Sequence, residues 1–167
     1  MKLLTVLAAV VISVPAVAAA QANAPAGTTA STAAIDEQVW SAISASVVDQ
    51  DIDAMAATYH PDAVVVTPGR TMPARNQLPQ WGKDMQTAKA RGETATVAFR
   101  FTKRVDNAET AFETGMFKYT VVDSTGKATS YHIPMEALLV RLHDRWVVLM
   151  ERQFAAATAQ EWDALTP

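Results

Sequence analysis

Residues 94–122 read TATVAFRFTKRVDNAETAFETGMFKYTVV, and this stretch decides the fold class because its apolar side chains recur at every second position. Val97, Phe99 and Phe101 alternate with polar residues, which is the pattern of a β-strand that buries one face. Asp106-Asn107 is typical of a turn, and a second long strand follows it. The stretch therefore predicts two long antiparallel strands joined by a tight turn.

Two further strands are expected on the C-terminal side, over residues 129–142 and 146–154. Several strands carry large apolar residues on both faces, whereas an antiparallel sheet with one wet face should alternate cleanly. The second face is therefore expected to be covered too, and a partner subunit is the economical cover, which predicts a homodimer. The residues expected on that second face are Phe112, Met116, Leu138 and Val140.

Three helices and one short strand are expected before residue 94. The first helix is indicated by an apolar residue at every fourth position: Ile35, Val39, Ile43 and Val47. The second begins after Asp51, a good N-cap, and cannot continue past Pro61. A β-branched strand over 64–67 and a third helix between Asn76 and Gly92 follow. This order predicts an α+β fold: a cone-shaped, strongly curved, mainly antiparallel sheet wrapped around three N-terminal helices, with room for a cavity.

The N-terminal residues predict export. Lys2 precedes an apolar run over 3–14, and small residues follow Pro15, which is the tripartite pattern of a secretory signal peptide. We expect a signal peptide over 1–20 (cleavage after Ala20 or Ala22), a flexible spacer over 21–33, one domain over 34–157 and a C-terminal tail over 158–167. The run is shorter than the ~20 residues of a membrane span, so a retained anchor is the less favoured alternative. The protein is thus expected to be periplasmic or secreted, with no membrane contact after cleavage.

Composition excludes several classes of function. The chain has 14 basic and 17 acidic residues, and loss of Lys2 with the leader gives 13 minus 17, or −4, so no nucleic-acid binding is expected. Without cysteine, neither a disulfide nor thiol chemistry is possible. Three scattered histidines lack the spacing of a metal site, and no phosphate loop or nucleophile elbow is visible. We expect no metal and no cofactor.

The motif order resembles a known superfamily. The helix pair, Tyr59-His60-Pro61-Asp62-Ala63-Val64, Pro68-Gly69 and the third helix are similar to the nuclear-transport-factor-2-like (cystatin-like) superfamily, especially the SnoaL-like and ketosteroid-isomerase-like branch of unassigned function. Ala111-Phe112-Glu113-Thr114-Gly115 and Asp144-Arg145-Trp146-Val147-Val148 fit later strands of that fold. The resemblance covers residues 34–155 and implies the cone with its pocket. The isomerase's tyrosine and paired acids find no match here, so the likeness implies a fold rather than a reaction.

Strand alternation suggests which residues face the cavity. If Trp146 points inward, Met150 and Arg152 do as well, because side chains alternate along a strand. The same argument places Glu113 and Phe117 inward. A buried carboxylate needs a partner, so Glu113 and Arg152 are the expected pair. They are either a structural salt bridge or the polar anchor of an apolar ligand site.

The candidate residues support two classes of function. The candidate catalytic residues are Glu113, His60 and Asp62, although the two near Pro61 are more simply explained by local turn structure. The candidate ligand-binding residues, which would otherwise be ordinary core, are Trp40, Tyr59, Trp81, Phe117, Met150 and Arg152. The first function is an exported pocket protein that binds a small apolar or aromatic molecule. The alternative is a cofactor-free isomerase, cyclase or dehydratase that uses a pocket carboxylate or histidine for proton transfer. A purely structural or interaction module remains if side chains fill the cavity, so enzymatic activity stays open.

Overall fold

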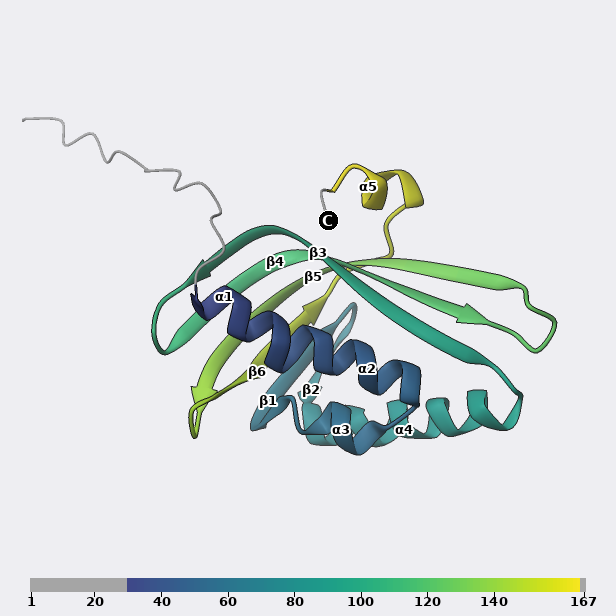
Figure 1. Cartoon of the computed structure of the whole chain (residues 1–167), viewed down its shortest axis with the longest axis horizontal. Coiled ribbons are helices and arrows are strands. Elements are labelled where there is room, and N and C mark those ends of the chain that lie inside the picture. Colours follow the sequence, from purple (N-terminus) through teal and green to yellow (C-terminus); the bar gives the residue numbers. More distant parts are fainter. Residues whose placement is uncertain (1–29, 166–167) are drawn as a thin grey trace, which may run out of the picture.

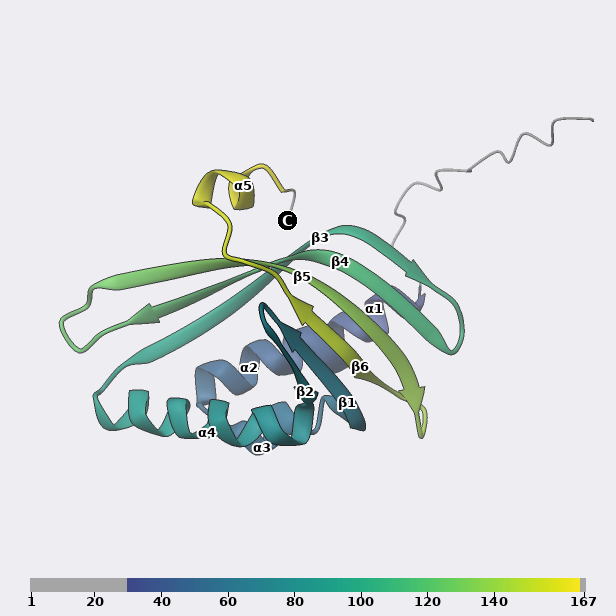
Figure 2. The ribbon, with the colours of Figure 1, turned by 180° about the vertical axis from the view of Figure 1, so that it is seen from behind.

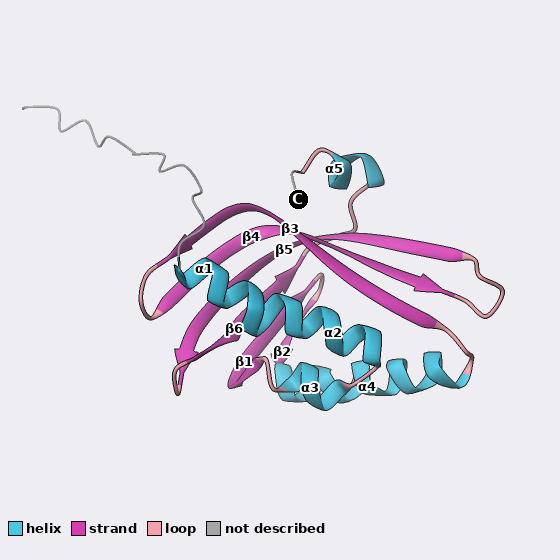
Figure 3. Cartoon of the chain, in the orientation of Figure 1, coloured by secondary structure: helices cyan, strands magenta, loops and turns pink. Residues whose placement is uncertain are grey.

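The computed structural model describes residues 30–165, so the expected signal peptide and residues 21–29 of the expected spacer lie outside the described residues. The helices α1 to α4 lie on one side of a curved sheet and α5 lies on the other (Figure 1). Figure 3 separates the helical layer from the strands by colour. No helix within residues 30–165 is both long enough and apolar enough to cross a membrane.

The first expected helix is a continuous helical run from Ala30 to Asp49, divided into α1 (Ala30–Ile35), the π-helical segment η1 (Asp36–Ser41) and α2 (Ala42–Asp49). The residues of the i+4 stripe, Ile35, Val39, Ile43 and Val47, are all buried. Because an α-helix has 3.6 residues per turn, each step of four residues would carry the stripe about 40° around the helix. The wider turn of η1 rotates less per residue and brings the stripe back toward the sheet.

The second expected helix is shorter than its apolar pattern suggested. It is α3 (Ile52–Ala56), and the Asp51 side chain caps it by accepting hydrogen bonds from the backbone N–H groups of Asp53 and Ala54. Strand β1 (Tyr59–Thr67) starts almost at once, because the chain pairs with another strand from Tyr59 onward. The third expected helix is α4 (Ala74–Ala90).

The sheet has six strands in the order β2-β1-β6-β5-β4-β3. The remaining strands are β2 (Arg70–Pro73), β3 (Thr94–Asp106), β4 (Thr110–Val122), β5 (Ala128–Leu142) and β6 (Arg145–Gln153). Only β1 and β6 run parallel; every other pair is antiparallel. The expected fold class, a curved and mainly antiparallel sheet around N-terminal helices, is confirmed.

Two β-bulges change which side chains face the helices. In β3 the pairing passes from Phe101 to Lys103, which leaves Thr102 as the extra residue. In β6 it passes from Val148 to Met150, which leaves Leu149 as the extra residue. One extra residue reverses the inward and outward alternation of everything after it.

The outer face of the sheet is covered in part by the chain's own C-terminal segment. Residues 158–165, expected to be a tail, include α5 (Ala159–Asp163), which a Thr158–Glu161 capping box starts. Trp162 of α5 is buried, with the Arg100 guanidinium 4.4 Å and the Lys118 ammonium 5.4 Å from its ring centre. Figure 2 shows α5 across the sheet from the other helices. The residues expected on this face, Phe112, Met116, Leu138 and Val140, do alternate with the inward-facing Glu113 and Leu139.

Gly115 permits the bulge in β3. A Cβ atom at this position would overlap the backbone carbonyl of Arg100 and would lie 2.9 Å from the Cα of Phe101. Backbone cannot move aside as a flexible side chain can, so only glycine fits opposite this bulge.

We therefore expect Gly115→Ala to lower the free energy of unfolding by about 3 kcal/mol, as overpacking against a fixed backbone does. Urea denaturation of the purified protein measures this loss. Gly82→Ala is the matched control, because a Cβ there meets the Ile52 side chain, whose atoms can shift. An equal or larger loss in Gly82→Ala would show that the close approach of β3 and β4 is not what requires Gly115.

Candidate functional site

A cavity of about 470 Å³ lies between the helices and the concave face of the sheet. The helices α2 and α3 with η1, the helix α4 and the inward faces of the strands contribute its walls. Its volume is in the range of small-molecule sites, which are usually apolar with a few placed polar groups. The side chains that characterise its lining are Trp40, Val47, Tyr59, Trp81, Phe99, Phe117, Tyr119, Tyr131, Ile133, Glu151 and Gln153.

Seven of the lining residues are aromatic. The ring centre of Trp40 lies 4.8 Å from that of Phe99, and Phe99 lies 6.2 Å from Phe117. On the other side, Tyr59 and Trp81 are 6.3 Å apart. These separations are those of packed aromatic pairs, so the rings are held in place by one another. Four of the predicted ligand-binding residues, Trp40, Tyr59, Trp81 and Phe117, thus line the cavity.

A buried carboxyl group reaches the cavity wall from β6. Glu151 is 6% exposed, and its two oxygens accept hydrogen bonds from the Tyr59 hydroxyl and, at 2.6 Å, from the Gln153 side-chain amide. Burial raises the pKa of Glu151, and the two hydrogen bonds oppose this only in part. Burial, followed by the nearby Glu151 charge, raises the pKa of Tyr59 well above its ordinary value. The Glu151 carboxyl, which can accept a proton, and the Tyr59 hydroxyl, which can donate one, thus lie side by side in a largely apolar site.

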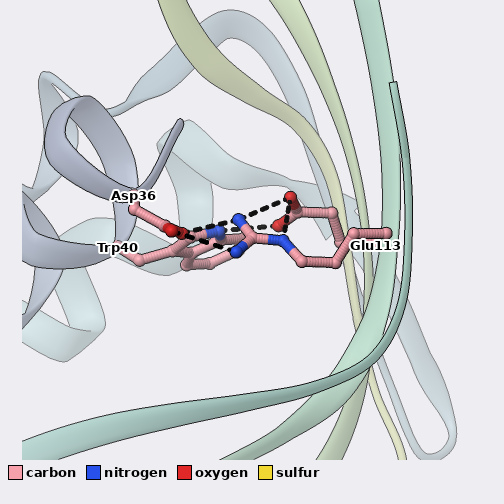
Figure 4. Close-up of polar contacts among 4 residues, drawn as sticks. Asp36, Trp40 and Glu113 are labelled. Atoms are coloured by element: carbon pink, nitrogen blue, oxygen red, sulfur yellow. Dashed lines mark hydrogen bonds and ion pairs between the residues drawn. The ribbon is translucent and has the colours of Figure 1, made fainter. Parts of the chain in front are cut away.

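A second buried acid, Glu113, ties the first helix to the sheet. Its side chain is 1% exposed; one oxygen accepts a hydrogen bond of 2.7 Å from Trp40 Nε1, and the other lies 2.8 Å from Arg104 Nη2. The same guanidinium binds Asp36 of the helix at 2.6 Å. Figure 4 shows Asp36, Trp40 and Glu113 converging from the helix and the sheet. Burial raises the pKa of Glu113, while Arg104 and Trp40 oppose the shift.

The expected pairing of Glu113 with Arg152 is wrong. Arg152 follows the bulge at Leu149, so its side chain lies on the outer face, where it is 49% exposed and 3.4 Å from Glu136. Met150 turns outward for the same reason, and neither residue lines the cavity. The bulge at Thr102 instead turns Arg104 inward to meet Glu113.

The other two candidate catalytic residues do not reach the cavity. His60 and Asp62 lie on β1 rather than at a helix end, and His60 Nδ1 accepts a hydrogen bond of 3.0 Å from the backbone N–H of Asp62. Glu113 lies behind Trp40 and is not among the lining residues either. Within residues 30–165, no group of histidines and acids is arranged to hold a metal ion.

Comparison with known proteins identifies the architecture. No protein-family model matches the sequence, and no curated protein does. Similar solved structures include a ketosteroid isomerase-like protein from Erwinia carotovora atroseptica, at 21% identity and a TM-score of 0.54, covering 75% of this chain and 95% of that one. A protein of unknown function with a cystatin-like fold from Nostoc punctiforme matches at 14% identity and 0.55, covering 78% and 95%. A nuclear transport factor 2-like superfamily protein from Salmonella enterica matches at 11% identity and 0.58, covering 78% and 96%.

The chain has the nuclear-transport-factor-2-like, or cystatin-like, fold. The expected resemblance is therefore confirmed at the level of architecture. At these identities the likeness carries no substrate, partner or catalytic residue to this protein.

Sequence reasoning missed Glu151, the most unusual polar group in this fold's cavity. The stretch from Trp146 to Met150 is apolar at every position, so it hides the register and gives no sign of the bulge. Simple alternation from Trp146 places Arg152 inward. With the bulge at Leu149 included, alternation places Glu151 and Gln153 inward instead. The one signal available was an acidic residue directly after the apolar run from Trp146 to Met150, because an acid there requires a buried partner or an exposed face.

The network around Arg104 predicts an order of stabilities. Arg104→Met strands a carboxylate that is 1% exposed and should cost about 3 to 5 kcal/mol. Glu113→Gln leaves Arg104 with Asp36 and should cost about 1 to 2 kcal/mol. Arg152→Met, at a half-exposed pair, should cost about 1 kcal/mol or less. Chemical denaturation of the three variants ranks them, and equal losses for Arg104→Met and Arg152→Met would contradict the network.

The burial of Glu151 predicts a pH dependence. Because its pKa is raised in the folded state, the fold favours the protonated form, and stability falls as the pH rises from the ordinary carboxyl value through the raised pKa. Glu151→Gln lacks this ionisation, so its free energy of unfolding should gain on that of the wild type as the pH rises. Urea denaturation from pH 4.5 to 8 measures the difference. The matched control is Glu136→Gln on the outer face, and an equal trend there would mean that burial of Glu151 is not the cause.

Proposed function

We propose that this protein binds a small apolar or aromatic molecule in the cavity of its nuclear-transport-factor-2-like fold. The observation that carries the proposal is the cavity itself, which has a volume of about 470 Å³ and is lined in part by aromatic rings that pack on one another. A core designed only for stability would fill such a space, because protein interiors are close-packed. The polar pair of Tyr59 and Glu151 supplies the few oriented groups that fix a ligand in an apolar site.

The cavity proposal is tested with a neutral aromatic probe, 2-(hydroxymethyl)naphthalene, by isothermal titration calorimetry. The wild type should show saturable binding. Val97→Trp fills the cavity from its β3 wall and should weaken binding at least tenfold. Val105→Trp places the same ring on the same strand at a position 54% exposed and should leave the affinity unchanged. Binding that survives Val97→Trp would place the probe elsewhere on the molecule.

A second candidate function is proton-transfer catalysis without a cofactor, as in an isomerase, cyclase or dehydratase. It is supported by the hydrogen bond between Glu151 and Tyr59, because a carboxyl whose pKa is raised by burial can both accept and return a proton. The proton-transfer role expected of Glu113, His60 or Asp62 is proposed here for Glu151 and Tyr59, because these two residues line the cavity. Native mass spectrometry of protein from its own host would identify a co-purified ligand. With that molecule, Glu151→Gln should abolish turnover if the protein is an enzyme.

The proposal includes export and a homodimer. The charged and apolar leader supports export to the periplasm or beyond, and the intact mass of the mature protein should lack residues 1–20 or 1–22. The half-buried apolar side chains of Phe112, Leu138 and Val140 on the outer face, beside α5, support a second copy as their cover. Sedimentation of the wild type gives the subunit count, and a monomer at high micromolar concentration would contradict the dimer.

A further inference from the structure

The charges around the cavity are all of one sign. Its ionisable lining residues, apart from tyrosines, are Asp84, Glu93 and Glu151, and within residues 30–165 no lysine, arginine or histidine lines it. The chain as a whole is nearly balanced, with 14 basic and 17 acidic residues, so the one-sided lining is a local property. A negative ligand would meet no compensating charge in this wall.

Glu151 has no positive partner. Its hydrogen-bond partners, Tyr59 and Gln153, are neutral donors, and it takes part in no ion pair among the described residues. Glu113 is buried to a similar degree and has Arg104 beside it. A buried carboxylate without a cation is costly, and the cost is relieved when a cation binds next to it. Among the described residues, Glu113 therefore has a cation beside it, whereas Glu151 has only neutral hydrogen-bond donors.

The other two acids line the cavity from α4 and from the residues just after it. Burial raises the pKa of Tyr119, a lining residue, and the charges of Asp84 on α4 and Glu93 after it raise this pKa further. Asp84 is exposed and receives a hydrogen bond from the Gln80 amide at 3.0 Å. The nearest ion-pair partner of Glu93 is Arg91, 3.8 Å away on a largely exposed side chain. Acidic groups at a cleft raise the local concentration of cations and repel anions.

The walls suit a cation as well. Aromatic faces attract ammonium groups, and this attraction is strongest where water is excluded. Tyr59 contributes both its ring to the wall and its hydroxyl to Glu151, so a positive group beside Glu151 would also lie near the Tyr59 and Trp81 rings. Both features favour a molecule with an apolar body and an ammonium head.

We infer that the ligand of this cavity is a cationic amine with an aromatic or apolar body, bound with its ammonium group against Glu151. This inference rests on the proposed binding function and adds the charge of the ligand. The apolar body lies against the part of the cavity wall that Trp40, Phe99 and Phe117 form, and the acids Asp84 and Glu93 favour entry of the positive charge.

The test compares three probes that share one ring system: 2-(aminomethyl)naphthalene, 2-(hydroxymethyl)naphthalene and 2-naphthoate. Calorimetry at pH 8 and low salt should show the amine binding at least tenfold more tightly than the alcohol, and the naphthoate more weakly than both. In Glu151→Gln the ratio of amine to alcohol affinity should fall to within about twofold. The matched control Glu136→Gln removes a carboxylate from the outer face and should keep the wild-type ratio.

Each outcome bears on a separate claim. If the alcohol and the amine bind the wild type equally well, the charge inference is overturned and the binding function stays intact. The same conclusion follows if the preference for the amine survives in Glu151→Gln. If none of the probes binds, the proposed function fails and the inference with it. Should Glu151→Gln not fold, as judged by circular dichroism, the double variant Asp84→Asn/Glu93→Gln replaces it. The preference for the amine should then fall about threefold and lose its dependence on salt, and an unchanged preference would overturn the inference.

Discussion

One partly buried guanidinium joins the N-terminal helix of this fold to its sheet. Arg104 lies between Glu113 of the sheet and Asp36 of the long N-terminal helix, and Trp40 of the same helix donates to Glu113. These contacts fix where the helix crosses the concave face. They thereby also fix the position of Ile43 and Val47, which lie further along the same helix and form part of the cavity wall. Without Arg104, an acid that is almost fully buried would have to lose its charge or its burial.

Two glutamates on neighbouring parts of one sheet have different roles because their surroundings differ. Glu113 meets a cation from its own chain and becomes part of the scaffold. Glu151 meets only neutral donors, and its pKa is raised by burial while it lines a cavity. Perturbed acids of the second kind occur preferentially at functional sites, since a fold gains no stability from them. Glu151 therefore gives the cavity an ionisable group, which its apolar walls alone do not supply.

Much of the architecture could be predicted from the sequence, because periodicity and turn residues act locally. The alternation of Val97, Phe99 and Phe101 and the i+4 stripe of the first helix placed the sheet and helix correctly. The site was less predictable, since it depends on which side of a strand a residue faces. Neither bulge has a local signal, and each depends on long-range pairing, as at Gly115 opposite Phe101. The docking of Trp162 on Arg100 likewise joins residues 62 positions apart.

The bulge at Leu149 has a consequence for comparing this chain with its structural relatives. The one extra residue there exchanges the inward and outward side chains over the rest of β6. An alignment that ignores the insertion would match Arg152 with inward positions of an unbulged strand and would assign the wrong charge to the cavity. Evolution can therefore invert the electrostatic character of such a cavity by gaining or losing one codon, without altering any helix or turn.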